Sequence, residues 1–405
     1  MTIGIGGSTV QEELAKMTPL YTDVPRIGVD DYIARVKRAQ EMMREKGIDA
    51  LYLDSSPNLF YFTGMSLKLT ERLHGAIIPV EGDVIYLSPS FEEPKTRSLM
   101  LFGDDVRVWE EHEDPTALVA DTLLGMGLPG NTIAVDPLTP FFSFDGFRRH
   151  GNRFDFVNGD AITAACRMVK SDAEIELLRA ANMITLEVHK AVARILRPGI
   201  KASEAGEFAL EAHRRLGAVS PGGKPLIMFG PETAYPHGVG YDQELKEGDM
   251  VLVDIGGFVG GYRSDMTRTY VFGDPTPRQR EVWEIEQTSQ LAGFNAAVLD
   301  DPCENVDNAA RKVIGDAGFS PDYETPGLPH RTGHGIGLEV HEATYMVRGN
   351  MTPMQPGLCF SVEPTICIYG EFGIRLEDCA YMTADGPKWL TPPSPSIDDP
   401  FGYEV

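Results

Sequence analysis

Hydrophobic and polar positions in the first 160 residues alternate between helical and strand-like spacing. Apolar residues recur every three or four positions across 30–46, which predicts a helix that stops at Gly47. A second helix is expected near 115–123. The expected strands are short apolar runs bounded by turn residues, at 48–54, 75–80, 83–88 and 132–136. This alternation predicts a small α/β domain over residues 1–160, the first 25 of which form an arm with little periodicity.

From residue 161 onward the helices are longer and the strands come in hairpin-like pairs. Ser171 and Glu174 form a capping box, and the apolar helical face that follows ends at Arg197-Pro198-Gly199. The other expected helices are at 203–216, after Pro277 and at 306–317. The hairpin-like segments are 249–272, 334–347 and 357–383. Residues 161–405 are therefore predicted to form an α+β domain with helices on one side of an antiparallel sheet.

Composition and charge narrow the classes of protein that this chain can belong to. Its 405 residues are 42% hydrophobic and 24% charged, as in folded globular proteins, and the length suits two domains. The net charge of −24 argues against nucleic acid and anionic membranes as partners. No apolar run reaches the roughly 18 residues of a membrane span, and the first residues lack the pattern of a secretion signal.

The cysteines indicate a reducing compartment. There are five of them, an odd number, and no two are spaced as CxxC. We therefore expect buried, reduced thiols and a cytoplasmic protein.

Two pairs of carboxylates fall on predicted hairpins. Asp254 ends the apolar strand of VLVDIGG, and Asp265 follows in SDMTRTYVF. A hairpin centred on Val259-Gly260 would place these two acids directly opposite each other. Glu363 and Glu377 are related in the same way about a centre at Gly370.

A histidine-rich segment lies between the two hairpins. HRTGHGIGLEVHE contains His330, His334 and His341, and glycines flank His334 on both sides. Four carboxylates and an imidazole that converge would balance and coordinate two divalent cations. The oxygen-rich set favours Mn²⁺ or Co²⁺, while affinity alone allows Zn²⁺.

These stretches resemble the Xaa-Pro peptidase family, which includes prolidases and Xaa-Pro aminopeptidases with the pita-bread fold. The matching segments AYPHG, VLVDIGGFVGGYRSDMTRTY, HRTGHGIGLEVHE, SVEP and GIRLED occur in family order across about residues 225–380. The first 160 residues resemble the family's smaller α/β domain, the creatinase/prolidase N-terminal type. The resemblance implies a pita-bread metallopeptidase domain over 161–405 and is strongest to compact bacterial Xaa-Pro dipeptidases.

The resemblance also implies roles for individual residues. The metal ligands would be Asp254, Asp265, His334, Glu363 and Glu377. His237 of AYPHG would lie on the substrate side, His341 would steady the tetrahedral intermediate, and Glu363 would also shuttle the proton. His330 and Arg375 would line the site.

Two further positions bear on the site, one as a candidate anchor and one as a departure from the family pattern. Arg348, in YMVRGN, is a candidate anchor for the substrate carboxylate, with an ordinary surface arginine as the alternative. Cys367 stands where the family often has a tyrosine, so a contact from that hydroxyl is absent or supplied elsewhere.

The implied activity is hydrolysis of the Xaa-Pro bond by a hydroxide that bridges two metal ions, with dipeptides as the first choice of substrate. The family implies a homodimer. An Xaa-Pro aminopeptidase acting on longer peptides is the nearest alternative. A small-metabolite lyase, a creatinase-like C–N hydrolase and a non-catalytic peptide-binding relative are the others.

Overall fold

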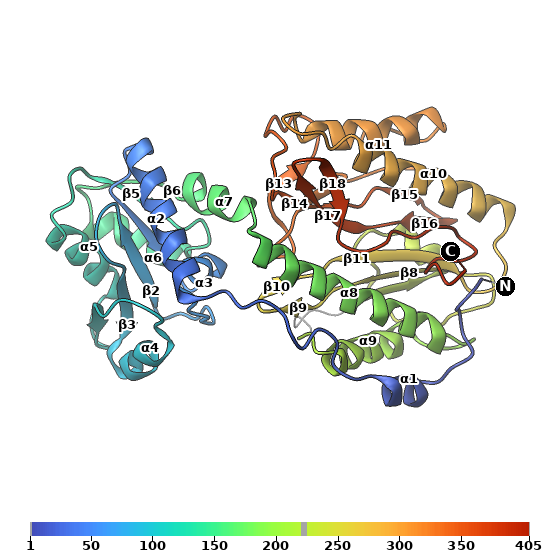
Figure 1. Cartoon of the computed structure of the whole chain (residues 1–405), viewed down its shortest axis with the longest axis horizontal. Coiled ribbons are helices and arrows are strands. Elements are labelled where there is room, and N and C mark those ends of the chain that lie inside the picture. The colour runs from blue at the N-terminus through green and yellow to red at the C-terminus, as the bar shows by residue number, and fades with distance from the viewer. Residues whose placement is uncertain (1, 220–224, 405) are drawn as a thin grey trace. The chain divides into compact units, whose positions relative to one another are not determined.

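The computed structural model describes residues 2–219 and 225–404. Its contacts divide the chain into a smaller unit, residues 27–167, and a larger unit, residues 1–26 with 168–405 (Figure 1). The arm at the start of the chain thus packs with the larger unit. The division of the family domains at residue 160 stays a prediction.

The smaller unit is built on a mixed six-stranded sheet in the order β4-β3-β2-β1-β5-β6. The four predicted strands are all present, and β2 and β3 form the predicted antiparallel hairpin. The two edge strands, β4 and β6, were not predicted, because half or more of their residues are exposed. The strands are β1 (Ala50–Leu53), β2 (Gly75–Pro79), β3 (Ile85–Pro89), β4 (Val106–Trp109), β5 (Thr132–Val135) and β6 (Asp155–Asn158).

The helices of this unit include both predicted ones, α2 and α5. The helix α2 is capped by Gly47, whose φ of 65° fits the left-handed conformation that stops a helix. The others are short, at ten residues or fewer, and among them α3 begins at a side-chain cap, Ser56. The helices are α2 (Val29–Lys46), α3 (Pro57–Thr63), η1 (Ser90–Glu92), α4 (Glu93–Leu99), α5 (Pro115–Gly125), α6 (Phe141–His150) and α7 (Asp160–Met168).

The larger unit contains the four predicted helices. The capping box of Ser171 and Glu174 opens α8. The bounds are α1 (Val10–Lys16), α8 (Asp172–Ile195), α9 (Ala202–Leu216), η2 (Gly230–Ala234), α10 (Pro277–Asn295) and α11 (Glu304–Asp316). No helix in the described ranges is long and apolar enough to cross a membrane.

The strands of the larger unit form small antiparallel sheets, β11-β8-β7, β10-β9, β13-β12-β14-β17-β18 and β15-β16. The bounds are β7 (Leu226–Phe229), β8 (Met250–Ile255), β9 (Phe258–Val259), β10 (Tyr262–Arg263), β11 (Met266–Val271), β12 (Gly333–Gly335), β13 (Glu342–Met346), β14 (Cys359–Val362), β15 (Thr365–Ile368), β16 (Phe372–Arg375), β17 (Asp378–Thr383) and β18 (Gly386–Trp389).

Helices cover these strands on two sides, which corrects the prediction of helices on one side. Figure 1 shows α8 and α9 on one side of β8 and β11, and α10 and α11 on the other. Val251 and Val253 pack in the core that α8 and α9 share, whereas Met250 packs with Trp283 of α10. Because side chains alternate along a strand, Asp254 points away from the α8 face.

The arm at the start of the chain is fixed to α8 through one buried acid. Glu13 of α1 accepts hydrogen bonds from the Arg194 guanidinium at 2.8 and 3.0 Å and from Lys16 at 2.8 Å. Burial raises the pKa of Glu13, but these hydrogen bonds outweigh it and lower that pKa from 4.5 to about 2.

Glu13→Gln is expected to lower the melting temperature at pH 7, with a loss of about 1–2 kcal/mol because Arg194 remains partly exposed. Since folding lowers the pKa of the Glu13 carboxyl, its contribution to the free energy of unfolding is complete above pH 4.5. That contribution disappears as the pH falls toward 2. Thermal unfolding between pH 7 and 3 measures the difference. Glu207→Gln, at an exposed position of α9, is the control. A difference that stays constant with pH would contradict the assignment.

Candidate metal centre

The first pair of carboxylates lies on the hairpin formed by β8 and β11. Asp254 faces Thr267, so Asp265 lies diagonally across from Asp254, and the prediction that the two acids are directly opposite is wrong. The turn is the reason, because its two central residues are Gly260 and Gly261, both with positive φ. Diagonal neighbours still share one face of a sheet, so the two carboxylates point the same way.

The second pair is placed as the sequence predicted. Glu363 and Glu377 lie opposite each other, in a register that is continuous around the hairpin tip at Gly370. A bridge between Thr267 and Glu377 joins this hairpin to β11. Thr267 is also the residue that faces Asp254, so the bridge brings the two pairs of carboxylates together.

The ring of His334, on β12, lies among these acids. Its Nε2 atom is 3.1 Å from Glu363, 3.4 Å from Asp265 and 3.9 Å from Glu377. Its Nδ1 atom is 3.0 Å from the carbonyl of Gly335. A proton on Nδ1 that is donated to this carbonyl leaves the Nε2 lone pair directed at the carboxylates.

The donor atoms fit a divalent metal ion. Ligand atoms lie within 4.8 Å of one another in three groups, which are Asp265 with His334 and His341, His334 with Glu363 and Glu377, and Asp254 with Asp265 and Glu377. The buried Nε2 of His334 and Oε1 of Glu377 have no hydrogen-bond partner among the described residues. Buried polar atoms are rarely left unpaired, so a cation is the partner that suits them.

The electrostatics of the cluster reflect crowded negative charge. Burial raises the pKa of Asp254 to about 7, opposed by Arg375. Burial also raises the pKa of Glu377, and the neighbouring carboxylates add to it. Burial raises the pKa of Glu363, but the adjacent His334 imidazole outweighs it and lowers that pKa to about 2. A bound cation would relieve this mutual repulsion.

The other predicted residues of the site lie around this cluster. Arg375 donates hydrogen bonds to Asp254 and to the carbonyl of Pro236, which ties the turn carrying His237 to the cluster. The exposed ring of His341 contacts that of His334 edge-on, with centroids 4.1 Å apart. His330 is half-buried; burial lowers its pKa, and the charge of Glu363 opposes this.

Arg348 lies on the surface in an ion pair. Its Nη1 atom is 2.8 Å from Asp322, and its side chain is 45% exposed. Its backbone N–H donates to Asp307. To anchor a substrate, this guanidinium would have to give up Asp322, and its role as an anchor stays a prediction.

Cys367 is fully buried in β15, and burial raises the pKa of its thiol to about 12. The thiol therefore remains neutral at ordinary pH. Two residues further on, the exposed ring of Tyr369 packs against Tyr235, with centroids 5.1 Å apart.

Two features near the cluster were not found from the sequence. Lys170 and Glu342 form a buried ion pair at 3.2 Å, although they are 172 residues apart in the chain. Glu342 directly follows His341. Arg331 lies over the ring of Tyr345 at 4.1 Å. The motif HRTGHGIG contains Arg331, and an arginine three residues before a candidate ligand histidine was a usable signal.

The fold and the donor set together define a metal-dependent hydrolase with a pita-bread catalytic domain. Residues 176–384 match the metallopeptidase family M24, and residues 35–169 match the creatinase/prolidase N-terminal domain. The chain belongs to metallopeptidase family M24, whose members use divalent metal ions.

Named relatives support this placement over nearly the whole chain. A probable dipeptidase PepE of Mycobacterium tuberculosis is 34% identical over 89% of this chain and 94% of that protein. An Xaa-Pro dipeptidase of Lactobacillus helveticus is 29% identical over 87% of this chain and 95% of its own length. The crystal structure of dipeptidase PepE from Mycobacterium ulcerans superposes with a TM-score of 0.84 at 32% identity, covering 91% of this chain and 97% of that one.

Proposed function

We propose that this chain hydrolyses the peptide bond before proline in Xaa-Pro dipeptides. The observation that carries the proposal is the unpaired Nε2 of His334, set among carboxylates from both hairpins. The relative named as an Xaa-Pro dipeptidase supports the choice of substrate. The test is release of proline from Ala-Pro, beside dipeptides without proline, before and after metal removal. Equal rates on the whole panel, or none, would refute it.

The proposed cofactor is a pair of divalent ions, with Mn²⁺ ahead of Co²⁺ and Zn²⁺ because the donors are mostly carboxylate oxygens. The residues that would hold them are Asp254, Asp265, His334, Glu363 and Glu377. Such ions, when bound, polarise the scissile carbonyl and lower the pKa of water enough to supply hydroxide at neutral pH.

Glu363 is the residue we assign to proton transfer. Its side chain is 14% exposed, so the carboxylate stays partly accessible. It accepts the proton that the attacking water loses and delivers it to the proline nitrogen as the C–N bond breaks. The amine of proline is a poor leaving group until it is protonated.

His237 and His341 are assigned to the carbonyl oxygen of the substrate. Both rings are exposed, and neither makes a hydrogen bond to another described residue. Each therefore has an N–H to donate to the oxygen as it gains negative charge. Arg375 acts through others, since it holds both Asp254 and the Pro236 carbonyl.

Dipeptides are expected to be cleaved faster than longer chains. We predict that kcat/KM for Ala-Pro exceeds that for Ala-Pro-Ala by about ten- to a hundredfold, because a charge-assisted contact to the free carboxylate is lost in the tripeptide. Proline release under saturating Mn²⁺ measures both. Equal values would favour an aminopeptidase acting on longer peptides.

We further propose a cytoplasmic homodimer. The five cysteines are free and buried, which suits a reducing compartment. Phe141 and Phe142, at the start of α6, are 74% and 56% exposed, and exposed aromatic pairs are frequent at interfaces. Light scattering of the purified protein tests the oligomeric state, and cell fractionation tests the location.

A further inference from the structure

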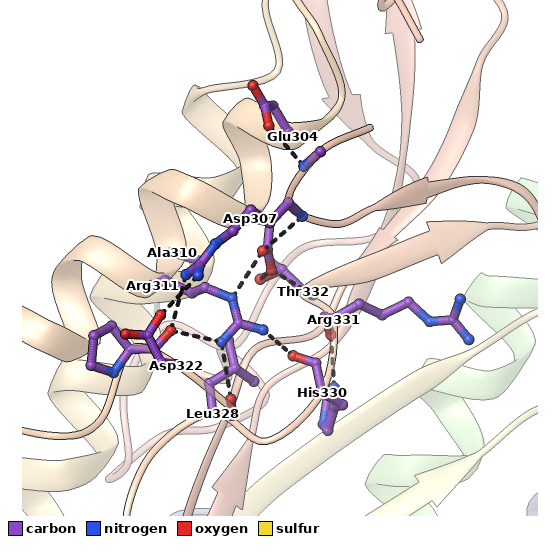
Figure 2. Close-up of polar contacts among 12 residues, drawn as sticks. Glu304, Asp307, Ala310, Arg311, Asp322, Leu328, His330, Arg331 and Thr332 are labelled. Atoms are coloured by element: carbon purple, nitrogen blue, oxygen red, sulfur yellow. Dashed lines mark hydrogen bonds and ion pairs between the residues drawn. The ribbon is translucent and has the colours of Figure 1, made fainter. Parts of the chain in front are cut away.

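The segment that leads into His334 is held from behind by one buried ion pair on α11. Arg311 and Asp307 are 2% and 0% exposed in their side chains and are 2.9 Å apart. Figure 2 shows both side chains directed at the backbone of residues 328–332. That stretch is mostly irregular, so its position depends on these contacts.

The ion pair fixes the chain on both sides of Arg331. The Arg311 guanidinium donates to the carbonyls of Leu328, at 3.0 Å, and His330. Asp307 accepts from the backbone N–H of Thr332 at 3.1 Å and from its hydroxyl at 2.7 Å. With its neighbours on either side held in this way, the direction of the Arg331 side chain is set.

Arg331 points away from this cluster and lies over Tyr345, whose strand pairs with the strand that carries His334. In Figure 2 its side chain extends to the side opposite Arg311. Its guanidinium lies 4.1 Å from the centre of the Tyr345 ring. Tyr345 is the residue that faces His334 across β12 and β13, so their side chains share one face of the sheet. The charge of Arg331 also acts on the nearby His341 ring.

Unlike Arg375, Arg311 and Arg348, Arg331 has no acid to pair with among the described residues. Arg375 is paired with Asp254, Arg311 with Asp307 and Arg348 with Asp322. No carboxylate among the described residues lies within 4 Å of Arg331. A half-buried guanidinium stacked on an aromatic ring keeps its planar edge free for a bidentate contact to a carboxylate.

We propose that Arg331 binds the free carboxylate of the dipeptide substrate and so restricts the enzyme to dipeptides. This rests on the proposed Xaa-Pro dipeptidase function. The carboxylate is the one negative group of a dipeptide such as Ala-Pro, and an unpaired guanidinium is the group best suited to bind it. Arg331 is better placed than Arg348, whose charge Asp322 already neutralises.

The test compares Ala-Pro with its C-terminal amide in wild type, Arg331→Met and Arg280→Met. Methionine keeps an unbranched side chain and removes the charge. Arg280→Met is the matched control, at an arginine of α10 that is paired with Asp398. Wild type should prefer the free acid by about ten- to a hundredfold in kcat/KM. Arg331→Met should reduce this ratio to near one, mainly through KM, and weaken inhibition by proline. Arg280→Met should leave both unchanged.

Metal content and circular dichroism are measured on every variant. If Arg331→Met is poorly folded, Arg331→Lys keeps the charge without the bidentate edge, and its ratio should fall between those of wild type and one. A ratio that survives in both Arg331 variants overturns the proposal. The proposal is also overturned if the Arg331 variants lose kcat/KM only on substrates with an acidic first residue. Arg331 would then contact the residue before the scissile bond, not the proline carboxylate. If wild type does not cleave Ala-Pro at all, the proposed function itself fails.

Discussion

Asp265→Asn is expected to abolish proline release and to lower the metal content of the purified protein. Asp265 belongs to two of the three groups of ligand atoms, and its carboxylate lies 3.4 Å from His334 Nε2. Asparagine has nearly the same shape but removes one negative charge from the four that balance two divalent ions. Losing a metal's contribution removes several kcal/mol of transition-state stabilisation, or about 10³-fold or more in rate.

Metal analysis and proline release are measured on the same preparation, with Asp385→Asn as the control. Asp385 is an exposed acid in the turn between β17 and β18, in the same unit as the metal centre. That variant should retain full activity and metal. An Asp265→Asn protein with wild-type activity and full metal content would show that Asp265 is not a ligand.

The two hairpins show when cross-strand pairs can be predicted from residue numbers alone. Around Gly370 the turn is symmetric about one residue, and the predicted register of Glu363 and Glu377 is confirmed. In the other hairpin, two successive glycines occupy the turn, and the register depends on which two residues take positive φ. Because Gly260 and Gly261 take these positions, Asp265 lies diagonally across from Asp254. This two-residue offset leaves the same side chains on the same face of the sheet, so the hydrophobic pattern of the sequence does not reveal it.

The long helices were predictable because each has a sustained apolar face and a recognisable cap. The helix α1 was missed, because seven residues are too few to show a period, although Thr9 and Glu12 form a capping box. The helices on both sides of β8 were missed for another reason. A strand buried on both faces reads as a continuous apolar run, which does not say what covers each face.

Contacts between distant irregular segments were beyond prediction. The hydrogen bonds of Arg311 go mostly to backbone carbonyls, which every residue has, so no side-chain pattern indicates them. The ion pair of Lys170 and Glu342 joins the start of the larger unit to the segment after His334. Chemistry-bearing residues in compact motifs could be found from the sequence, whereas the residues that position them depend on tertiary packing.

The turn that carries His237 is fixed to the metal centre without belonging to it. The N–H of Gly238 donates to the carbonyl of Tyr235 at 2.9 Å, which closes a tight turn. Arg375 donates to the carbonyl of Pro236 and to Asp254, so the turn and a candidate ligand share one guanidinium. His237 itself is exposed and lies outside all three groups of ligand atoms.

His237→Ala is therefore expected to keep its metal and lose most of its rate. Removing one donor to a developing oxyanion costs about 10²–10³ in kcat, and the backbone contacts that hold the turn do not need the imidazole. Steady-state kinetics on Ala-Pro and metal analysis measure the two quantities. His112→Ala, at an exposed histidine of the smaller unit, should change neither. If His237→Ala loses metal in proportion to its loss of rate, His237 is a metal ligand, and His341 alone stabilises the oxyanion.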